Sequence, residues 1–343
     1  MSGKLQLVLP GLFDLPLSEL APDLLADKLP GMNRILRLAN AQPNQAFTID
    51  SVLQQVLNFP THRESPAPSL PLAQACASSD IEKANRTLLF QAVHLQPDLH
   101  SAIIVPIQNN PDNLDDITII INDLKDLFKV DFNIVSVADG LFLMTLNELE
   151  APTHYPHILS VLGKPANPYI EQSRDNLNWY KLLNEIQMFM HQHPVNDERG
   201  RSGRLPLNSL WFWGGGGLPR QYDGDLAWCC DDPTLNRFAE SLGLMTLGLG
   251  ELTDLDASSD VVCIDLRLLE LLKTGVATEL DQLLLDIEAG LLTPLLSIVD
   301  QKRKRLWLRA GFEFDFELTP AAGLKFWRRP RNLMNWDQQL REP

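Results

Sequence analysis

The stretch from Asn208 to Pro219, N-S-L-W-F-W-G-G-G-G-L-P, constrains the fold more than any other part of the chain. Residues 210–213 are apolar and aromatic without a helical period, which predicts a short strand buried on both faces. The four glycines at 214–217 then predict a loop, because glycine reaches positive φ freely and weakens regular elements. Unhindered N–H groups in such a loop can form an anion-binding concavity. A tight turn that lets the sheet pack explains the glycines equally well.

The second half of the chain alternates between strand and helix patterns, which predicts an α/β fold with a layered, mainly parallel sheet. The expected strands there are residues 210–213, 226–228, 261–264 and 306–308. Helices are expected at 176–193 and 233–242, and residues 268–299 are expected to be largely helical. Open α/β sheets bind ligands at the carboxyl ends of their strands, which makes the glycine loop the expected site.

The first half opens with an expected strand at 4–9, and helical patches follow at 17–29 and 51–59. Prolines between residues 60 and 71 suggest an extended connection or lid. Beyond it, the expected elements are strands at 93–95 and 102–107, a helix at 114–128, and a hairpin of 132–137 and 141–146 turning at Asp139-Gly140. We therefore expect three segments: residues 1–90 as the N-terminal part of an α/β core with a proline-rich connection, 91–165 as a small α+β module, and 166–343 as the main α/β core with the glycine-rich loop.

The chain of 343 residues carries a formal net charge of -15, which argues against general binding to nucleic acid or to anionic membranes. No stretch suggests a signal peptide or a membrane span. The four cysteines lack C-x-x-C spacing, so neither a zinc site nor a disulfide framework is indicated. We expect a soluble, cytoplasmic protein.

A polar stretch at residues 193–201, H-P-V-N-D-E-R-G-R, is expected to form a loop between the helix at 176–193 and the glycine-rich strand. Guanidinium groups recognise phosphate or carboxylate, so Arg199, Arg201 and Arg204 are candidates for holding an anion. A solvated basic loop explains them at least as well. The predicted ligand-binding residues are Glu185, Asn196, Arg199, Asn208, Ser209, Trp211, Trp213, Gly214, Gly215 and Gly216.

The sequence gives little support for a metal-binding site or for a catalytic nucleophile. No histidine follows His193, so a metal site in the C-terminal half would depend on carboxylates. Asp223, Asp225, Asp231 and Asp232 form an acidic cluster that suits a divalent ion, although a solvated acidic loop explains it better. There is no G-x-S-x-G, no P-loop lysine and no G-x-G-x-x-G at a strand-to-helix turn. We therefore expect neither a metal nor another cofactor, and we assign no catalytic residue.

Three short stretches carry a resemblance to known families: N-E-I-Q-M at 184–188, H-P-V-N at 193–196 and N-S-L-W-F-W-G-G-G at 208–216. Together they resemble bacterial regulatory proteins of the RpfE type over most of the chain. The last stretch is also similar to the N-x-I-W-x-W-G-x-G motif of archaeal-type cofactor-independent phosphoglycerate mutases, mainly after residue 176. The mutase resemblance implies a core like that of alkaline phosphatase, two metal ions and a nucleophilic serine.

The departures from the mutase pattern fall on the metal ligands. The family's first strand ends in Asp-Gly, whereas the strand at 4–9 ends in Pro10-Gly11. A late Asp-His pair corresponds here to Ala310-Gly311-Phe312-Glu313, and the stretch 261–273 retains only Asp265 where the family has a His and an Asp. Since a two-metal site needs several convergent ligands, family-type phosphoryl transfer is not expected.

The resemblance leads to a first hypothesis of a catalytically degenerate phosphoglycerate mutase-like protein, a pseudoenzyme with a regulatory or anion-sensing role. Its expected partner is a small anionic ligand or a protein. The alternative is a working metal-dependent phosphotransferase or phosphatase whose ligands are carboxylates. A purely structural role in a complex is a third possibility, because a fold does not fix a function.

Overall fold

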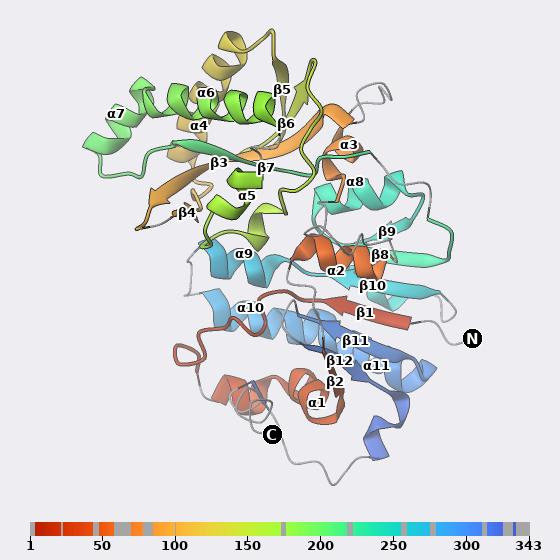
Figure 1. Cartoon of the computed structure of the whole chain (residues 1–343). Helices are drawn as coiled ribbons and strands as arrows, with labels where there is room; N and C mark the ends of the chain where they lie inside the picture. The colour runs from red at the N-terminus through yellow and green to blue at the C-terminus, as the bar shows by residue number, and fades with distance from the viewer. Residues whose placement is uncertain are drawn as a thin grey trace. The chain divides into compact units, whose positions relative to one another are not determined.

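The computed structural model describes residues 4–21, 23–43, 48–57, 70–77, 85–99, 101–172, 176–217, 222–254, 259–274, 279–310, 314–324 and 332–333. The chain divides into two compact units (Figure 1). The first combines Met1–Phe59 with Gln221–Pro343, and the second is the continuous segment Pro60–Arg220. This division differs from the expected segments 1–90, 91–165 and 166–343, because the glycine-rich loop belongs to the second unit. Most of the expected proline-rich connection lies outside the described residues.

The first unit is a mixed α/β unit built on a seven-stranded sheet of order β2-β12-β11-β1-β10-β8-β9. The strands are β1 (Lys4–Val8), β2 (Asn40–Pro43), β8 (Leu226–Cys230), β9 (Met245–Leu247), β10 (Asp260–Ile264), β11 (Arg305–Arg309) and β12 (Phe314–Leu318). The five strands from β11 to β9 are parallel, as predicted, whereas β12 pairs antiparallel with both β11 and β2. The sheet is therefore mixed, with its parallel part at the centre.

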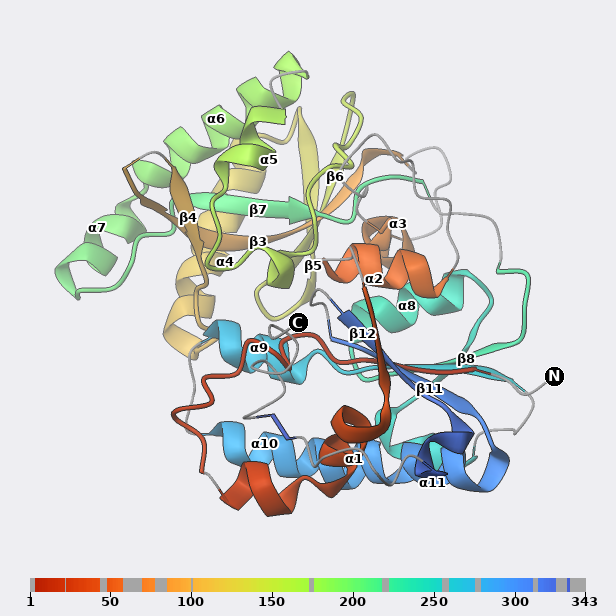
Figure 2. The same cartoon turned by 60° about the horizontal axis from the view of Figure 1, so that its bottom comes forward.

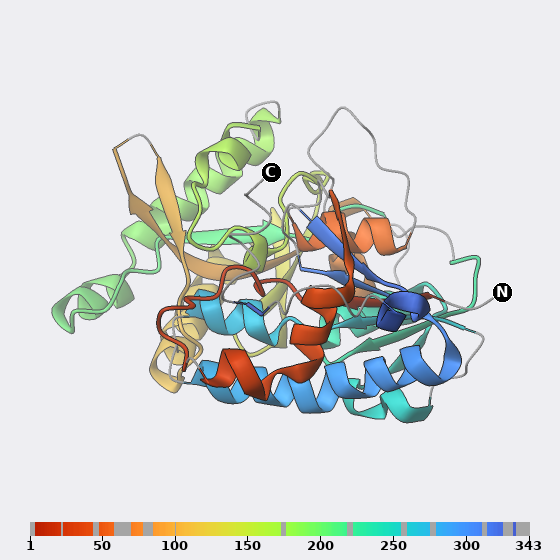
Figure 3. The same cartoon turned by 90° about the horizontal axis from the view of Figure 1, so that it is seen from below.

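Helices cover both faces of this sheet, with α1, α10 and α11 on one face and α2 and α8 on the other (Figure 2). The helical segments of the unit are η1 (Leu24–Lys28), α1 (Pro30–Leu38), α2 (Ile49–Val56), α8 (Pro233–Ser241), η5 (Leu249–Asp254), α9 (Arg267–Thr274), α10 (Leu280–Ile287), η7 (Glu288–Leu292), α11 (Thr293–Lys302) and η8 (Pro320–Leu324). The view from below, in Figure 3, shows α10 and α11 following one another along the sheet.

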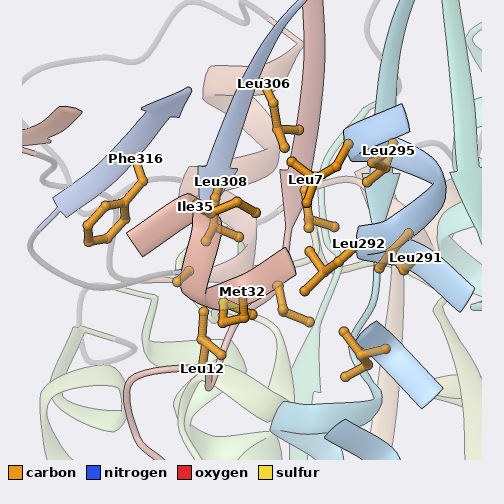
Figure 4. Packing of buried hydrophobic residues seen from close by; sticks show 14 of the residues in the cluster. Leu7, Leu12, Met32, Ile35, Leu291, Leu292, Leu295, Leu306, Leu308 and Phe316 are labelled. Atoms are coloured by element: carbon orange, nitrogen blue, oxygen red, sulfur yellow. The ribbon is translucent and has the colours of Figure 1, made fainter. Parts of the chain in front are cut away.

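One face of the sheet is filled by aliphatic side chains, and we call it the apolar face. Leu5, Leu7, Leu306 and Leu308 point to it from the two central strands, and each is fully buried. Figure 4 shows these strands contributing to one packed cluster with Met32 and other residues of α1, η7 and α11. Burial of this cluster is the main source of stability for the first unit, since removal of apolar surface from water is the dominant favourable term in folding.

The opposite face carries polar and charged side chains from the same strands, and we call it the polar face. Its members on β1 and β11 are Lys4, Gln6, Arg305, Trp307 and Arg309. The pleat places them there, because they alternate with the buried leucines. In the register of the two strands Lys4 is opposite Arg305 and Gln6 is opposite Trp307, whereas Arg309 is opposite Val8. Central strands of a covered parallel sheet are usually apolar on both sides, so this composition is unusual.

The second unit is built on an antiparallel sheet in which the long strand β3 pairs with β4, β6 and β7, and β6 with β5. The strands are β3 (Thr87–Pro97), β4 (Ala102–Val105), β5 (Phe132–Ala138), β6 (Leu141–Leu146) and β7 (Ser209–Trp213). Its helices are α3 (Leu72–Cys76), α4 (Pro111–Leu127), η3 (Ile158–Ser160), α5 (Asn167–Gln172), α6 (Leu177–His191) and α7 (Pro194–Arg201). The predicted hairpin is confirmed, with Gly140 at φ +69° in its turn.

Strand β7 is buried on both faces, as its sequence predicts, but it lies in the antiparallel sheet. On one side the ring of Phe212 packs edge-on against Trp179, at 5.0 Å between centroids. On the other side Trp211 meets Tyr155 edge-on at 5.3 Å. The expectation that this strand belongs to the parallel sheet is wrong, because its ladder partner is β3.

Two helices depart from the sequence-based expectation. Residues 194–201 form helix α7, not a loop, because His193 accepts a hydrogen bond from the N–H of Val195 and Pro194 occupies the first turn, where its missing N–H is tolerated. The helical patch expected at 17–29 is reduced to η1, and the nine-residue α1 follows it unpredicted.

One continuous helical run among the described residues, Leu280–Lys302, has 23 residues and is long and apolar enough to cross a membrane. The expectation that no stretch has such a composition is therefore wrong for this run. Leu284, Leu291, Leu295 and Val299 from the run lie in the core of the first unit. A helix buried in a protein core requires the same composition.

A buried carboxylate joins this run to helix α1. Glu288 in η7 is 5% exposed and accepts hydrogen bonds from the N–H groups of Gly31 and Met32 in the first turn of α1. Those N–H groups have no partner within their own helix, and the negative charge suits the positive end of the helix dipole. Gly31 leaves room for the contact, since a Cβ there would lie 2.6 Å from Glu288 Oε1.

Candidate functional site

The carboxyl edge of the parallel strands in the first unit is the candidate site, because open α/β sheets bind ligands there. Two strands deliver acidic residues to this edge: Asp231 and Asp232 follow β8, and Asp265 follows β10. The neighbouring strand β1 delivers Leu9 and Pro10, and β11 delivers Ala310. Acidic side chains therefore come from only part of the edge.

Asp265 is engaged by the first residue of the helix that follows it. It is 1% exposed, and its Oδ1 accepts hydrogen bonds from Nε and the backbone N–H of Arg267 at 3.0 and 3.1 Å. Its Oδ2 accepts from Nη2 of the same arginine at 2.7 Å. This bidentate pair raises the pKa of Arg267, whose side chain remains 45% exposed. Both oxygens of the carboxylate are therefore occupied by this chain's own donors.

Asp231 and Asp232 each hold a backbone N–H of the structure around them. Asp231 Oδ1 accepts from the N–H of Leu249 at 3.0 Å, at the start of η5. Asp232 caps helix α8 by accepting from the N–H of Leu235 at 2.8 Å. Both residues thus have a structural role that explains their presence at the edge.

Burial and nearby carboxylates raise the pKa of two groups at this edge. Burial and the negative charges of Asp232, Asp231 and Asp265 raise the pKa of the Cys230 thiol to about 12. A thiol with this pKa is not a nucleophile at neutral pH. Burial, with a smaller contribution from Asp232, also raises the pKa of Glu270 in α9.

A groove of about 490 Å³ lies between α9 and α10, beside this edge. Arg267 lines it together with three carboxylates, from Glu270, Glu279 and Asp286. The groove thus holds one guanidinium among negative charges. A phosphate ester entering it would meet more repulsion than attraction.

The residues at this edge do not fit a two-metal centre. No three His, Cys, Asp or Glu side chains gather as potential metal ligands within the described part of the chain. The carboxylate nearest to such a role, Asp265, has both oxygens bonded to Arg267. Binding of a cation there would first require the loss of this ion pair.

Of the three arginines predicted to hold an anion, Arg199 is buried in the second unit, whereas Arg201 is exposed and pairs with Glu198 at 2.9 Å. Arg199 is 1% exposed and donates from Nη1 to Asp116 Oδ2 at 2.7 Å and to Asn113 Oδ1 at 2.9 Å, and from Nε to the carbonyl of Leu205. Arg204 donates to the same oxygen of Asp116. These bonds fasten α7 and the segment after it to α4.

The asparagines and Ser209 of the predicted site are bonded within the same unit. Asn196 bridges the carbonyls of Met190 and Leu207 and accepts from the N–H of Leu207. Asn208 pairs through both ends of its amide with the backbone of Leu95 in β3. Ser209 accepts from Gln187, and Glu185 lies exposed on α6. The polar residues are therefore distributed along α6, α7 and the stretch from Asn208 into β7, and ligand binding by them stays a prediction.

The tryptophans and glycines complete the packing around the end of β7. Trp211 donates its indole N–H to the carbonyl of Pro156, and Trp213 lies 2% exposed near the ring of His157. Gly214 has φ +75° and accepts from the N–H of Ala73 at 3.0 Å. A Cβ on Gly215 would lie 2.3 Å from the carbonyl oxygen of Pro152, and Gly216 has φ +117°. Close packing accounts for Gly215, positive φ for Gly216, and both for Gly214, while ligand binding by the loop stays a prediction.

Sequence reasoning assigned no role to Arg267 or Glu270. The signal for Arg267 was present in D-L-R directly after a buried strand, where an Asp and an Arg two residues apart can pair across a helix start. Glu270 carries no comparable signal, since its environment depends on Asp232 from another strand.

No protein-family model matches the chain. The chain is 30% identical over 74 residues to the 2,3-bisphosphoglycerate-independent phosphoglycerate mutase of Methanosarcina mazei. The matched stretch makes up 22% of this chain and 19% of that protein. It is 31% identical over 65 residues to the probable 2,3-bisphosphoglycerate-independent phosphoglycerate mutase of Geobacter sulfurreducens, 19% of this chain and 16% of that protein. The matches thus span about a fifth of these relatives. The predicted distant similarity to cofactor-independent phosphoglycerate mutases is confirmed, and the resemblance to RpfE-type proteins stays a prediction.

Two solved structures align with most of the chain. A cofactor-independent phosphoglycerate mutase from Thermoplasma acidophilum has a TM-score of 0.43 and 17% identity, and covers 93% of this chain and 89% of that one. A protein from Pyrococcus horikoshii has a TM-score of 0.48 and 14% identity, and the alignment covers 93% of this chain and 87% of that one.

Proposed function

We propose that this chain is a phosphoglycerate mutase-like protein without metal-dependent phosphoryl transfer, and that it acts as a regulatory sensor of a small anion. The observation that carries the proposal is the ion pair between Asp265 and Arg267 at the carboxyl edge of the parallel sheet. A carboxylate in a two-metal centre needs its oxygens for the cations. Here both oxygens accept hydrogen bonds from a guanidinium.

The lack of a metal-ligand group among the described residues and of any histidine after His193 supports the same conclusion. The regulatory part of the proposal draws on the RpfE-type resemblance of residues 184–188, 193–196 and 208–216. The cytoplasm is the proposed compartment, since the cysteine pattern indicates no disulfide framework.

The test is to measure metal content and phosphoglycerate mutase and phosphatase turnover of the purified full chain. Manganese, magnesium and zinc are supplied in turn with 3-phosphoglycerate, and the Methanosarcina mazei relative is assayed alongside as a positive control. We expect no stoichiometric metal and no turnover above the protein-free rate. Stoichiometric metal with metal-dependent turnover would establish the alternative, a working phosphotransferase that uses Asp231, Asp232 and Asp265.

A variant sharpens this test. Arg267→Ala removes the side-chain donors to Asp265, so the carboxylate becomes available. If the metal centre has been lost altogether, the variant will still bind no metal. Metal binding with turnover in Arg267→Ala alone would show that the ion pair inhibits an otherwise complete site, and would contradict the proposed loss.

A further inference from the structure

The polar face of the first unit encloses a pocket of about 280 Å³ near the amino ends of the parallel strands. It lies away from the carboxyl edge, where such sheets usually bind ligands. Lys4, Asp260, Arg305 and Leu226 are the first residues of their strands and line it, and α2 contributes Gln55 and Val56.

We propose that this pocket binds a small organic anion, a carboxylate or a phosphate ester, whose carbon skeleton lies against the indole of Trp307. The inference rests on the proposed function, because it places the ligand to which the sensor responds. The residues that carry it differ from those of the carboxyl edge and of the glycine loop.

The first argument is the balance of charge. Three cationic side chains, Lys4, Arg305 and Arg309, line the pocket against one carboxylate, Asp260. Arg305 and Arg309 form ion pairs with Glu317 and Asp315, at 3.1 and 2.9 Å, and these pairs neutralise the two guanidinium groups. The ammonium group of Lys4 pairs with no carboxylate side chain among the described residues, so it is the cation of this pocket that is available to an anion.

The second argument is the supply of unused donors. Within the described residues, Lys4 Nζ, Arg309 Nη2, the Tyr222 hydroxyl and the Trp307 indole N–H donate no hydrogen bond, and all four residues line the pocket. Most acceptors nearby are occupied, because the side-chain oxygens of Gln6 and Gln55 accept from Arg309 and Asp260 Oδ1 accepts from the N–H of Lys4. A pocket in which unused donors outnumber unused acceptors is suited to an acceptor-rich ligand.

Tyr222 and Arg309 are in suitable ionisation states. Burial and the charge of Asp260 raise the pKa of Tyr222, so its phenol remains a donor at neutral pH. The side chain of Arg309 is 15% exposed, and this desolvation lowers the pKa of its guanidinium, although the charge of Asp315 opposes the shift.

The volume limits the ligand to a metabolite. Pockets for drug-sized molecules are usually about 300–1,000 Å³, so this one holds a smaller molecule. Trp307, Val56 and Leu226 supply an apolar wall beside the donors. An inorganic ion would leave this wall unused, which favours an organic anion.

The test is isothermal titration calorimetry of the full chain with inorganic phosphate, phenyl phosphate, benzoate and 3-phosphoglycerate, with glycerol as the uncharged control. We expect at least one organic anion to bind, more weakly as salt is added, and inorganic phosphate to bind less well. Failure of all three organic anions to bind at millimolar concentration would overturn the inference.

Two variants locate the binding. Lys4→Gln and Tyr222→Phe remove groups without side-chain partners, so both should fold normally and weaken binding of the anion about 3- to 10-fold, the range of one hydrogen bond. Lys28→Gln, whose lysine pairs with Asp23 on the surface, is the matched control and should bind as the wild type does. Unchanged affinity in both pocket variants would place the ligand elsewhere. Unchanged affinity in the variants would contradict the pocket alone. The proposed function would fail on a different result, the detection of metal-dependent turnover.

Discussion

The two faces of the seven-stranded sheet are made by the same strands from opposite kinds of residue. On β11, Leu306 and Leu308 enter the packed cluster under α1 and α11, while Arg305, Trp307 and Arg309 line a pocket on the other side. The difference shows how one sheet separates stability from recognition. Because burial on the apolar face can supply the free energy of folding, donors on the polar face can remain without hydrogen-bond partners.

The apolar face should respond most strongly to substitution. Leu308→Ala removes a fully buried side chain from the cluster and should lower the free energy of unfolding by about 2–5 kcal/mol. Urea unfolding followed by circular dichroism measures the change. Trp307→Phe, the neighbouring position on the polar face, is the control and should lose about 1 kcal/mol or less. Equal losses in the two variants would contradict the division between the faces.

The Glu288 cap connects two helices of the apolar side. Glu288→Ala leaves the N–H groups of Gly31 and Met32 without their acceptor, and should destabilise the protein by about 1–3 kcal/mol. The matched control is Asp286→Ala, an exposed acid two residues earlier, with an expected change within about 0.5 kcal/mol. Equal melting temperatures for Glu288→Ala and Asp286→Ala would show that the cap does not contribute to stability.

On the polar face, the ion pairs should differ according to burial. Arg309→Met breaks the bonds to Gln6, Gln55 and Asp315, and we expect a loss of about 1–2 kcal/mol in urea unfolding. Arg305→Met breaks a pair whose arginine is 64% exposed and should change stability by about 0.5 kcal/mol or less. A larger effect of Arg305→Met than of Arg309→Met would show that burial does not control these pairs.

The smallest expected effect is a pH dependence from Glu288. Burial raises the pKa of this carboxyl group in the folded protein, although the N–H groups of Gly31 and Met32 oppose the shift. The folded state therefore binds the proton more tightly than the unfolded state, so this contribution to stability is full at low pH and is lost as pH rises through the folded pKa. As the pH rises from acid to neutral, the wild type should therefore lose stability relative to Glu288→Gln. Melting temperatures of the two proteins across this range measure the difference, and a gain by the wild type would reverse the predicted sign.

Sequence patterns identified the strands whose side chains are apolar in a continuous run. Residues 4–9, 226–228, 261–264 and 306–308 all lie in the central parallel strands, where burial on at least one face dictates composition. The pattern missed β2, whose residues N-A-Q-P have little strand propensity and are ordered by pairing with β12. It also missed β12, although F-D-F-E-L alternates as an exposed-edge strand does.

The candidate site could be predicted only as far as local sequence determines it. Arg199 beside a glycine run suggested an anion, yet its partner Asp116 lies 83 residues earlier in the chain. The polar-face pocket was not predicted at all, because Lys4, Tyr222 and Trp307 come from distant segments and none belongs to a motif. Lys4 and Trp307 come together through the pairing of β1 with β11.

The second unit interrupts the first in the sequence, and this affects the order in which the protein can fold during synthesis. Strand β1 finds its ladder partners only in β10 and β11, so the ribosome must reach Arg309 before the central pairing of the first unit can be complete. The second unit is one continuous segment, Pro60–Arg220, and can fold while the rest is being made. Until then the leucines of β1 lack the partners that will cover them, and a chaperone that holds apolar segments would find its substrate in these first residues.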